Sequence, residues 1–274
     1  MSAKVPIGIF DSGYGGLTVL KEIVRTLPQY DYVYLGDNAR APYGNRSFET
    51  VYQYTLECVK HLFAMNCELI ILACNTASAK ALRNIQQIDL PKMTPGKRVL
   101  GVIRPTVEVI DRYTQTGHVG VLGTPGTVSS NTYPIEIEHL FPQFEVHQEA
   151  CPMWVPIIEN GEIETPAAAY FVEMRINNLL RQDDRIDTII LGCTHYPLLR
   201  HKIEQFTPKG VNLIEQGQIV AQSLADYLKR HPELEQKCTK GGETEFFTTD
   251  YPANFDSAAS KFFGQEVKSK HLEL

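Results

Sequence analysis

The chain has 274 residues, of which 43% are hydrophobic and 21% are charged. These proportions are typical of a soluble globular protein and exclude wholesale disorder, a collagen-like repeat and a membrane channel. The 26 basic residues are outnumbered by 32 acidic residues, which gives a net charge of −6. Because an acidic chain repels phosphate groups, we expect no nucleic-acid partner.

The sequence also bears on location. The first residues lack the apolar stretch and the small-residue cleavage site of a secretory signal. The longest apolar runs have the length of a strand, which is too short to span a membrane. We therefore expect a cytoplasmic protein with no membrane partner, in which the six cysteines are reduced. The Cys and His residues show none of the spacings of a zinc site, so we expect no metal.

Short apolar runs alternate with segments of helical periodicity along the whole chain. Several runs consist of Ile, Leu and Val without alternating polar residues, as expected for strands that are covered on both faces. Strands separated by helices predict parallel sheets and an α/β fold. The predicted strands cover residues 7–10, 32–35, 69–73, 98–103, 119–122, 144–147, 188–191, 211–214 and 245–248.

Three helices are marked by their first or last residues. Apolar residues recur with helical periodicity over residues 17–27, and Pro28 ends the run. Thr165 followed by Pro166 predicts a helix that begins at the proline and has the threonine as its N-cap. Pro197 is similarly predicted to open a helix.

The chain contains a weak internal repeat. Residues 7–13 (IGIFDSG) resemble residues 119–125 (VGVLGTP), and residues 70–76 (IILACNT) resemble residues 189–195 (IILGCTH). This repeat predicts two pseudo-symmetric α/β domains with mainly parallel sheets.

Two loops rich in Pro and Gly are the predicted crossing points between the domains. They lie at residues 94–97 and 207–210. The first domain is then discontinuous, comprises residues 1–97 plus 211–274 and carries Cys74. The second domain comprises residues 98–210 and carries Cys193.

Cys74 and Cys193 occupy equivalent places in the two halves. Each follows an Ile-Ile-Leu run and one small residue, which predicts the carboxyl end of a strand, where ligands bind in open α/β sheets. A predicted helix follows Cys74, and a helix N-terminus lowers the pKa of a thiol. His195 lies two positions after Cys193. We expect the other cysteines to be buried as small hydrophobic residues, namely Cys58, Cys67, Cys151 and Cys238.

Two equivalent thiols predict symmetric proton transfer. One thiolate removes a proton from one face of a carbon atom, and the other thiol delivers a proton to the opposite face, which inverts the stereocentre. A cysteine hydrolase that uses Cys193 with His195 is an alternative, but it leaves Cys74 without a role. A non-catalytic protein that binds amino acids or another partner is a further alternative.

Five blocks carry a more specific pattern: residues 10–16 (FDSGYGG), 36–44 (GDNARAPYG), 73–78 (ACNTAS), 150–159 (ACPMWVPIIE) and 191–197 (LGCTHYP). These blocks resemble those of the glutamate racemases, within the aspartate/glutamate racemase superfamily. The resemblance implies a cofactor-independent isomerase that interconverts L- and D-glutamate and supplies D-glutamate for peptidoglycan. It also implies a homodimer whose subunits have two α/β domains that face each other across a cleft. An aspartate racemase or a related two-cysteine isomerase remains an alternative.

The resemblance also implies roles for individual residues. Cys74 and Cys193 become the two acid–base thiols. Asp11 assists Cys74, while His195 and its partner carboxylate Glu159 assist the second thiol. The remaining implied residues are Asp37, which supports the site, and the substrate-binding set of Asp11, Ser12, Pro42, Tyr43, Gly44, Asn75, Thr76, Thr124, Thr127, Thr194 and His195.

Each acidic residue also has a structural interpretation. Asp11 is placed to cap the helix that begins near Leu17. Glu159 precedes an Asn-Gly pair and is compatible with a solvated turn. Asp37 is compatible with a purely structural position.

Overall fold

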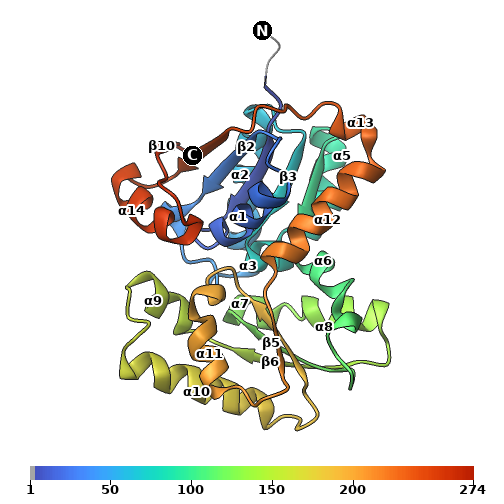
Figure 1. The fold of residues 1–274 in the computed structure, drawn as a ribbon. Coiled ribbons are helices and arrows are strands. Elements are labelled where there is room, and N and C mark those ends of the chain that lie inside the picture. The colour runs from blue at the N-terminus through green and yellow to red at the C-terminus, as the bar shows by residue number, and fades with distance from the viewer. Residues whose placement is uncertain (1–3) are drawn as a thin grey trace.

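The computed structural model describes residues 4–274, which form two units, each built around one parallel sheet (Figure 1). In the first sheet the strand order is β10-β9-β2-β1-β3-β4. Its strands are β1 (Ile7–Asp11), β2 (Tyr32–Gly36), β3 (Leu69–Leu72), β4 (Arg98–Gly101), β9 (Thr244–Thr248) and β10 (Ser269–His271).

The second sheet repeats the core of the first. Its strand order is β6-β5-β7-β8, which matches β2-β1-β3-β4 of the first sheet. Every strand pair within residues 4–274 is parallel. The predicted fold class of two pseudo-symmetric α/β domains is therefore confirmed. The strands of the second sheet are β5 (His118–Gly123), β6 (Glu145–Ala150), β7 (Thr188–Gly192) and β8 (Asn212–Ile214).

Helices pack on both faces of each sheet (Figure 1). The helices around the first sheet are α1 (Leu17–Thr26), η1 (Asn38–Arg40), α2 (Phe48–Ala64), α3 (Asn75–Lys80), α4 (Leu82–Asn84), η2 (Ile85–Asp89), α5 (Leu90–Met93), α12 (Gly217–Arg230), α13 (Pro232–Glu235) and α14 (Pro252–Phe263). Those around the second sheet are α6 (Ile103–Val107), η3 (Ile110–Arg112), α7 (Pro125–Ser129), α8 (Thr132–Leu140), α9 (Trp154–Glu159), α10 (Pro166–Leu180), η4 (Tyr196–Leu199) and α11 (Arg200–Phe206).

The predicted helix limits are confirmed where a proline or a cap marks them. Helix α1 ends shortly before Pro28. Thr165 Oγ1 accepts a hydrogen bond of 3.2 Å from the backbone N–H of Ala168 and so caps α10. The segment opened by Pro197 begins as the 3₁₀ helix η4 and continues as α11.

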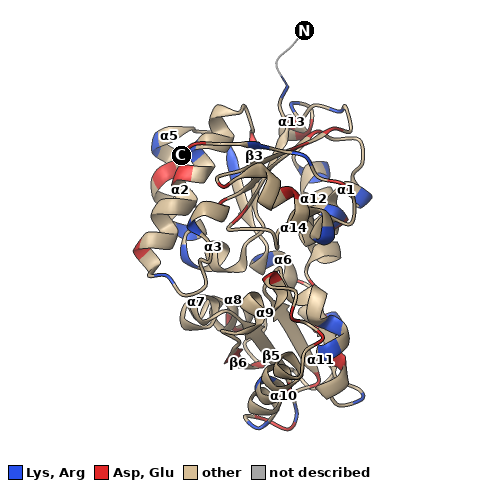
Figure 2. Ribbon diagram, turned by 90° about the vertical axis from the view of Figure 1, so that its left-hand side faces the viewer, with Lys and Arg blue, Asp and Glu red and all other residues tan. Residues whose placement is uncertain are grey.

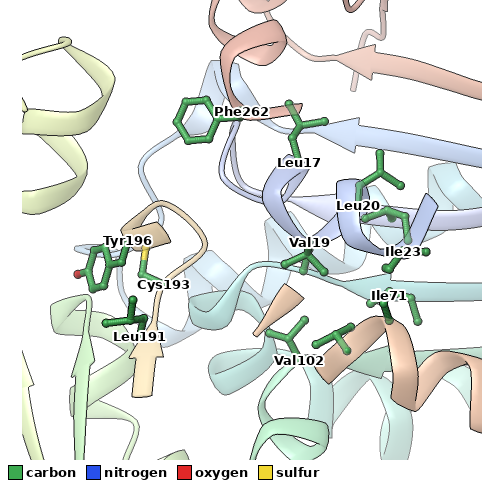
Figure 3. Packing of buried hydrophobic residues seen from close by; sticks show 14 of the residues in the cluster. Leu17, Val19, Leu20, Ile23, Ile71, Val102, Leu191, Cys193, Tyr196 and Phe262 are labelled. Carbon is green, nitrogen blue, oxygen red and sulfur yellow. The ribbon is translucent and has the colours of Figure 1, made fainter. Parts of the chain in front are cut away.

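Alternate residues of the inner strands face opposite layers of helices. In β3, Leu69 and Ile71 belong to the hydrophobic cluster that contains α1 and α12. Ile70 and Leu72 instead belong to the cluster that contains α2. Because both faces are covered, these strands need no polar alternation. The first cluster continues into the second unit, where it includes Leu191 (Figure 3).

Strand pairing differs from the predicted crossing points. β4 begins in the segment expected to open the second domain, yet it pairs with β3 of the first sheet. β8 begins in the segment expected to return to the first domain, yet it pairs with β7 of the second sheet. The loops at residues 94–97 and 207–210 therefore connect elements of one unit. We propose that the chain crosses between the domains after β4 and after β8.

The two units meet closely at two glycines. A Cβ atom on Gly15 would lie 2.3 Å from Thr194 Oγ1 and 2.4 Å from His195 Nδ1, so no larger residue fits there without a shift. The backbone N–H of Gly126 donates a hydrogen bond of 2.7 Å to the carbonyl oxygen of Gly44. These contacts hold the carboxyl ends of the two sheets against each other.

Charged side chains of both signs are interspersed over the two units (Figure 2). Arg104, for example, pairs with Glu108 at 3.0 Å and with Glu136 at 2.8 Å. Exposed pairs of this kind contribute little to stability. Within residues 4–274, no helix has both the length and the apolar character needed to cross a lipid bilayer.

A buried amide network joins the two units. Gln216 Nε2 donates hydrogen bonds to the carbonyl oxygen of Val102 at 3.2 Å and to Thr106 Oγ1 at 3.0 Å. Gln216 Oε1 accepts a hydrogen bond of 2.6 Å from Asn75 Nδ2. Tyr133 donates from its hydroxyl to Asn75 Oδ1 at 2.7 Å. The network thus holds Asn75, the residue that follows Cys74, in a fixed position.

This network predicts that Gln216→Leu destabilises the protein. The substitution leaves the Asn75 amide without its acceptor in a buried position, and an unsatisfied buried polar group costs about 1–3 kcal/mol. We expect the free energy of unfolding, measured by urea denaturation, to fall by this amount. Gln218→Leu on the same helix is the control, because Gln218 is exposed. Equal effects of the two substitutions would contradict the prediction.

Candidate active site

A cavity of about 60 Å³ lies between the carboxyl ends of the two sheets. Cys74 follows β3 and Cys193 follows β7, and both side chains line this cavity although each residue is only 6% exposed. A larger groove of about 1110 Å³ is bordered by α1 and α12, but neither cysteine borders it. The structure therefore brings the two predicted thiols to one site.

Cys74 is the N-cap of α3. Its Sγ accepts a hydrogen bond of 3.4 Å from the backbone N–H of Ala77 and lies 3.3 Å from Ser12 Oγ. The expected lowering of its pKa is wrong, because burial, and then the nearby carboxylate of Asp11, raise the pKa of the thiol to about 12. The contacts from Ser12 and Ala77 act in the opposite direction but are weaker. Cys74 is therefore a neutral thiol at neutral pH.

Cys193 lies beside a buried histidine. Its Sγ is 4.0 Å from His195 Nδ1, and His195 Nε2 is 2.9 Å from Glu159 Oε1. Burial by itself lowers the pKa of His195, but the contacts with Cys193 and Glu159 outweigh burial and raise this pKa to about 10. The imidazole ring is therefore protonated at neutral pH and holds a positive charge near the sulfur.

Asp11 lies behind the cavity rather than in its wall. Its Oδ2 accepts a hydrogen bond of 3.0 Å from the backbone N–H of Gly13, and its Oδ1 lies 3.5 Å from Thr194 Oγ1. The N-cap of α1 is Gly16, without a side-chain cap, so Asp11 is not the N-cap of this helix. Burial raises the pKa of Asp11, although the charge of His195 acts in the opposite direction.

Asp37 supports the loop at residues 41–45, which forms part of the cavity wall. Its buried carboxylate accepts a hydrogen bond from the hydroxyl of Tyr43. It also accepts hydrogen bonds from Arg40 Nε at 2.7 Å and from Thr249 Oγ1 at 2.8 Å. Asp37 itself does not border the cavity, so its contribution is to hold the loop in place.

Three threonine hydroxyls meet at the junction of the two units. Thr76 Oγ1 lies 2.9 Å from Thr124 Oγ1 and 3.3 Å from Thr127 Oγ1. The hydroxyls of Thr124 and Thr127 are 3.1 Å apart. A hydroxyl can donate and accept hydrogen bonds. These threonines can therefore offer either a donor or an acceptor to a ligand in the cavity. Thr127 lies behind the other two and does not border the cavity.

The structure brings most of the predicted site residues into one wall. Those that border the cavity are Ser12, Pro42, Tyr43, Gly44, Cys74, Asn75, Thr76, Thr124, Glu159, Cys193, Thr194 and His195. Asp11, Asp37 and Thr127 lie behind this wall and contact its members.

One side of the cavity was missed by the sequence interpretation. It is formed by Cys151, Pro152, Val155 and Pro156, at and before helix α9. Cys151 is buried as expected, and burial raises its pKa well above the usual range. The sequence contained a signal for this side, because these residues belong to the block at residues 150–159, one of the five on which the resemblance rests.

Two thiols from equivalent strands of a repeated α/β unit, in the wall of one cavity, fit an isomerase of the racemase class. The family model described as Asp/Glu/Hydantoin racemase matches residues 7–224, and the chain belongs to this family. A glutamate racemase from Geobacter metallireducens is 41% identical over 262 residues, which are 95% of this chain and 93% of that protein. The resemblance predicted from the sequence blocks is thus confirmed.

Solved structures agree with this assignment. A crystal structure of a glutamate racemase isoform from Bacillus anthracis matches 99% of this chain and 98% of its own, with a TM-score of 0.89 and 34% identity. The crystal structure of glutamate racemase from Francisella tularensis in complex with D-glutamate also matches 99% of this chain and 98% of its own, with a TM-score of 0.87 and 33% identity. An aspartate racemase from Picrophilus torridus matches 82% of this chain and 94% of its own, with a TM-score of 0.56 and 20% identity, which is a likeness of fold.

The raised pKa of His195 predicts a pH dependence of stability. The pKa in the folded state, about 10, lies above the value of about 6.5 for an unfolded histidine. The stabilisation by the protonated ring is therefore complete below about pH 6.5, declines as the pH rises, and is lost above about pH 10. Glu159→Gln removes the partner carboxylate, so we expect a lower pKa of His195 and a smaller decline.

Nuclear magnetic resonance titration of the His195 ring and urea unfolding at several pH values measure these two effects. Glu164→Gln is the matched control, because Glu164 pairs at 2.8 Å with the exposed His201. A His195 ring that titrates near pH 6.5 in the unmodified protein would show that the assigned charge state is incorrect.

Proposed function

We propose that this protein interconverts L- and D-glutamate without a cofactor, by proton transfer between the substrate α-carbon and two thiols. The observation that carries this proposal is the placement of Cys74 and Cys193, from equivalent strands of the two units, in the wall of one cavity. An α-carbon between the two sulfur atoms can lose its proton to one and receive a proton from the other, which inverts its configuration.

The two thiols have different surroundings, which suggests different acid–base roles. Cys74 holds its proton, because its pKa is raised to about 12 chiefly by burial, and so is suited to act as the acid. Cys193 faces the protonated ring of His195, which places a positive charge beside the second sulfur atom. In the proposed assignment Cys193 removes the proton of L-glutamate while Cys74 delivers one, and the roles reverse for D-glutamate.

Asp11, Glu159 and Asp37 act as positioning groups in this mechanism. Asp11 places a buried carboxyl beside Cys74, where it can balance the ammonium group of the substrate. Glu159 stabilises the protonated ring of His195. Asp37 holds the loop that contains Tyr43.

Neutral donors are proposed to bind the two carboxylates of glutamate. Among the described residues that border the cavity, none is Lys or Arg. The available donors are hydroxyls, an amide and backbone N–H groups, from Ser12, Gly44, Asn75, Thr76, Thr124 and Thr194. Fixed donors around the α-carboxylate stabilise the negative charge that develops when the α-proton leaves.

Access to the thiols requires movement of the cavity walls. Both cysteines are 6% exposed, so the substrate reaches them when the two units separate. Closure after binding excludes water, which strengthens every electrostatic interaction in the cavity.

A wider role is part of the same proposal. D-Glutamate made by this reaction supplies peptidoglycan synthesis in the cytoplasm, and the chain acts as a homodimer. The support for these statements is the resemblance to glutamate racemases over most of the chain. Light scattering of the purified protein measures the oligomeric state.

Substitution of either catalytic thiol tests the mechanism. We expect Cys74→Ser and Cys193→Ser each to slow racemisation about 10²–10⁴-fold, because each removes one positioned acid–base group. The circular dichroism of L-glutamate and of D-glutamate, followed with purified protein and no added cofactor, measures both directions. Cys238→Ser is the control, because Cys238 is buried away from the cavity. If either variant racemises glutamate at nearly the full rate, the two-thiol mechanism fails.

Comparison of two substrates separates this proposal from the aspartate racemase alternative. Glutamate and aspartate differ by one methylene group. A difference of this size typically changes kcat/KM about 10–200-fold between two substrates of one enzyme. We expect kcat/KM for glutamate to exceed that for aspartate by at least about tenfold. A higher value for aspartate would assign the protein to the alternative class. Tight binding of glutamate with no exchange of its α-hydrogen would instead indicate a binding protein.

A further inference from the structure

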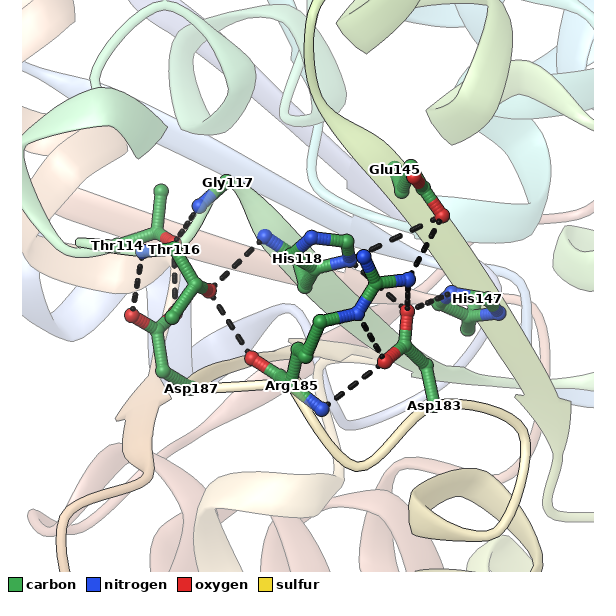
Figure 4. A network of polar contacts seen from close by, with 9 residues as sticks. All are labelled: Thr114, Thr116, Gly117, His118, Glu145, His147, Asp183, Arg185 and Asp187. Carbon is green, nitrogen blue, oxygen red and sulfur yellow. Dashed lines mark hydrogen bonds and ion pairs between the residues drawn. The ribbon is translucent and has the colours of Figure 1, made fainter.

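Four side chains with metal-ligand chemistry meet at the amino end of the second sheet (Figure 4). His118 is the first residue of β5 and lies opposite Glu145, the first residue of β6, in the parallel register. His147 follows two positions further along β6, and Asp183 lies in the loop between α10 and β7. One potential ligand atom from each of the four lies within 4.8 Å of all the others.

We propose that His118, His147, Asp183 and Glu145 bind one divalent transition-metal ion of the zinc type. Two imidazole nitrogens with two carboxylate oxygens are ligands that zinc accepts. In a tetrahedral site with bonds of about 2.0–2.1 Å, neighbouring ligand atoms are about 3.3 Å apart. The proposed site has separations on both sides of this value. Asp183 Oδ2 lies 2.9 Å from His118 Nδ1 and 3.2 Å from His147 Nε2, and Glu145 Oε2 lies 3.9 Å from His118 Nδ1.

A buried nitrogen at the centre of this cluster lacks a hydrogen-bond partner. His118 Nδ1 is inaccessible to solvent and makes no hydrogen bond, although Asp183 Oδ2 is 2.9 Å away. The side chain of His118 is 12% exposed and that of Asp183 is 5% exposed. A buried polar atom without a partner is rare in folded proteins. A metal ion bound to this nitrogen satisfies it.

The carboxylate of Asp183 is already oriented toward the two histidines. Its Oδ1 accepts hydrogen bonds of 2.9 Å from both the backbone N–H and the Nε of Arg185, which leaves Oδ2 to face the rings. Partners of this kind, which orient a ligand, are a regular part of metal sites.

The loop that carries Asp183 is fastened to the turn before β5. Thr116 Oγ1 donates a hydrogen bond of 3.0 Å to the carbonyl oxygen of Arg185. Asp187 accepts a hydrogen bond of 3.0 Å from the backbone N–H of Thr116 (Figure 4). It also accepts one of 2.7 Å from the backbone N–H of Gln115. The ligands from the loop and from the two strands are therefore held in a fixed arrangement.

The guanidinium of Arg185 competes with the ion for this position. Its Nη2 lies 2.9 Å from Asp183 Oδ2 and 3.5 Å from Glu145 Oε2, so it contacts both proposed carboxylate ligands. Its side chain is 57% exposed, so solvent can reach it. An incoming ion displaces Nη2 of the guanidinium from the two carboxylates. The backbone N–H of Arg185 continues to orient Asp183.

The proposed site is remote from the cysteines. Strand β5 runs from His118, at the cluster, to Gly123, at the edge of the cavity, a distance of about 17 Å at about 3.3 Å per residue. The ion would link β5, β6 and the loop before β7. Its expected effect is therefore on the stability of the second domain and not on the rate of proton transfer.

Cobalt and zinc titrations of the full chain test the proposal. We expect one Co²⁺ ion per chain with the strong visible absorption of a tetrahedral site and without a sulfur-to-cobalt charge-transfer band. Zn²⁺ at about one hundred times its Kd is expected to raise the unfolding temperature by roughly 5 °C. His147→Asn should weaken binding at least about tenfold.

His201→Asn is the matched control, because His201 pairs with a single carboxylate, Glu164, on the surface. It should bind metal as the unmodified protein does. The proposal is overturned if no Co²⁺ binds, if a sulfur band shows that the cysteines are the ligands, or if the His147 and His201 variants bind equally.

Discussion

Both sulfur atoms reach one cavity because two parallel sheets end against each other. In a parallel sheet all the strands point the same way, so the residues that follow them gather along one edge. Here two such edges are apposed, and each contributes one cysteine. The apposition is tight, since even a methyl group on Gly15 would overlap Thr194 and His195. The proposed chemistry depends on this closeness, because a single carbon atom must contact both thiols.

The repeat is symmetric in topology but not in charge. Cys74 has a hydroxyl and a buried carboxyl as neighbours, and its pKa is raised first by burial and also by Asp11 and the second thiol. Cys193 has a protonated imidazole as its neighbour. The two sulfur atoms therefore have different surroundings, with a carboxyl group near Cys74 and a cation near Cys193. For the reverse direction, the ammonium group of the substrate supplies the positive charge that favours a thiolate at Cys74.

The sequence predicted the inner strands well, because burial of both faces leaves an uninterrupted apolar run such as residues 69–72. It did not predict β10, a short polar strand (SKH) at the sheet edge, or the pairing of β4 and β8, which is a tertiary property. Motifs located most of the cavity wall. They could not give the sign of the pKa shift of Cys74, which depends on how deeply the closed domains bury it. Nor could they find the cluster around His118, whose members are spread along the chain and brought together by strand register.

The fate of the α-hydrogen in heavy water tests most directly the central claim, that two separate groups serve the two faces of one carbon. L-Glutamate is incubated with the protein in D₂O, the reaction is stopped early, and the deuterium content of each enantiomer is measured by mass spectrometry. The account predicts that the D-glutamate formed carries deuterium from the first turnovers, while the remaining L-glutamate still carries protium. D-Glutamate that retains the original hydrogen, or equal early labelling of both enantiomers, would contradict it.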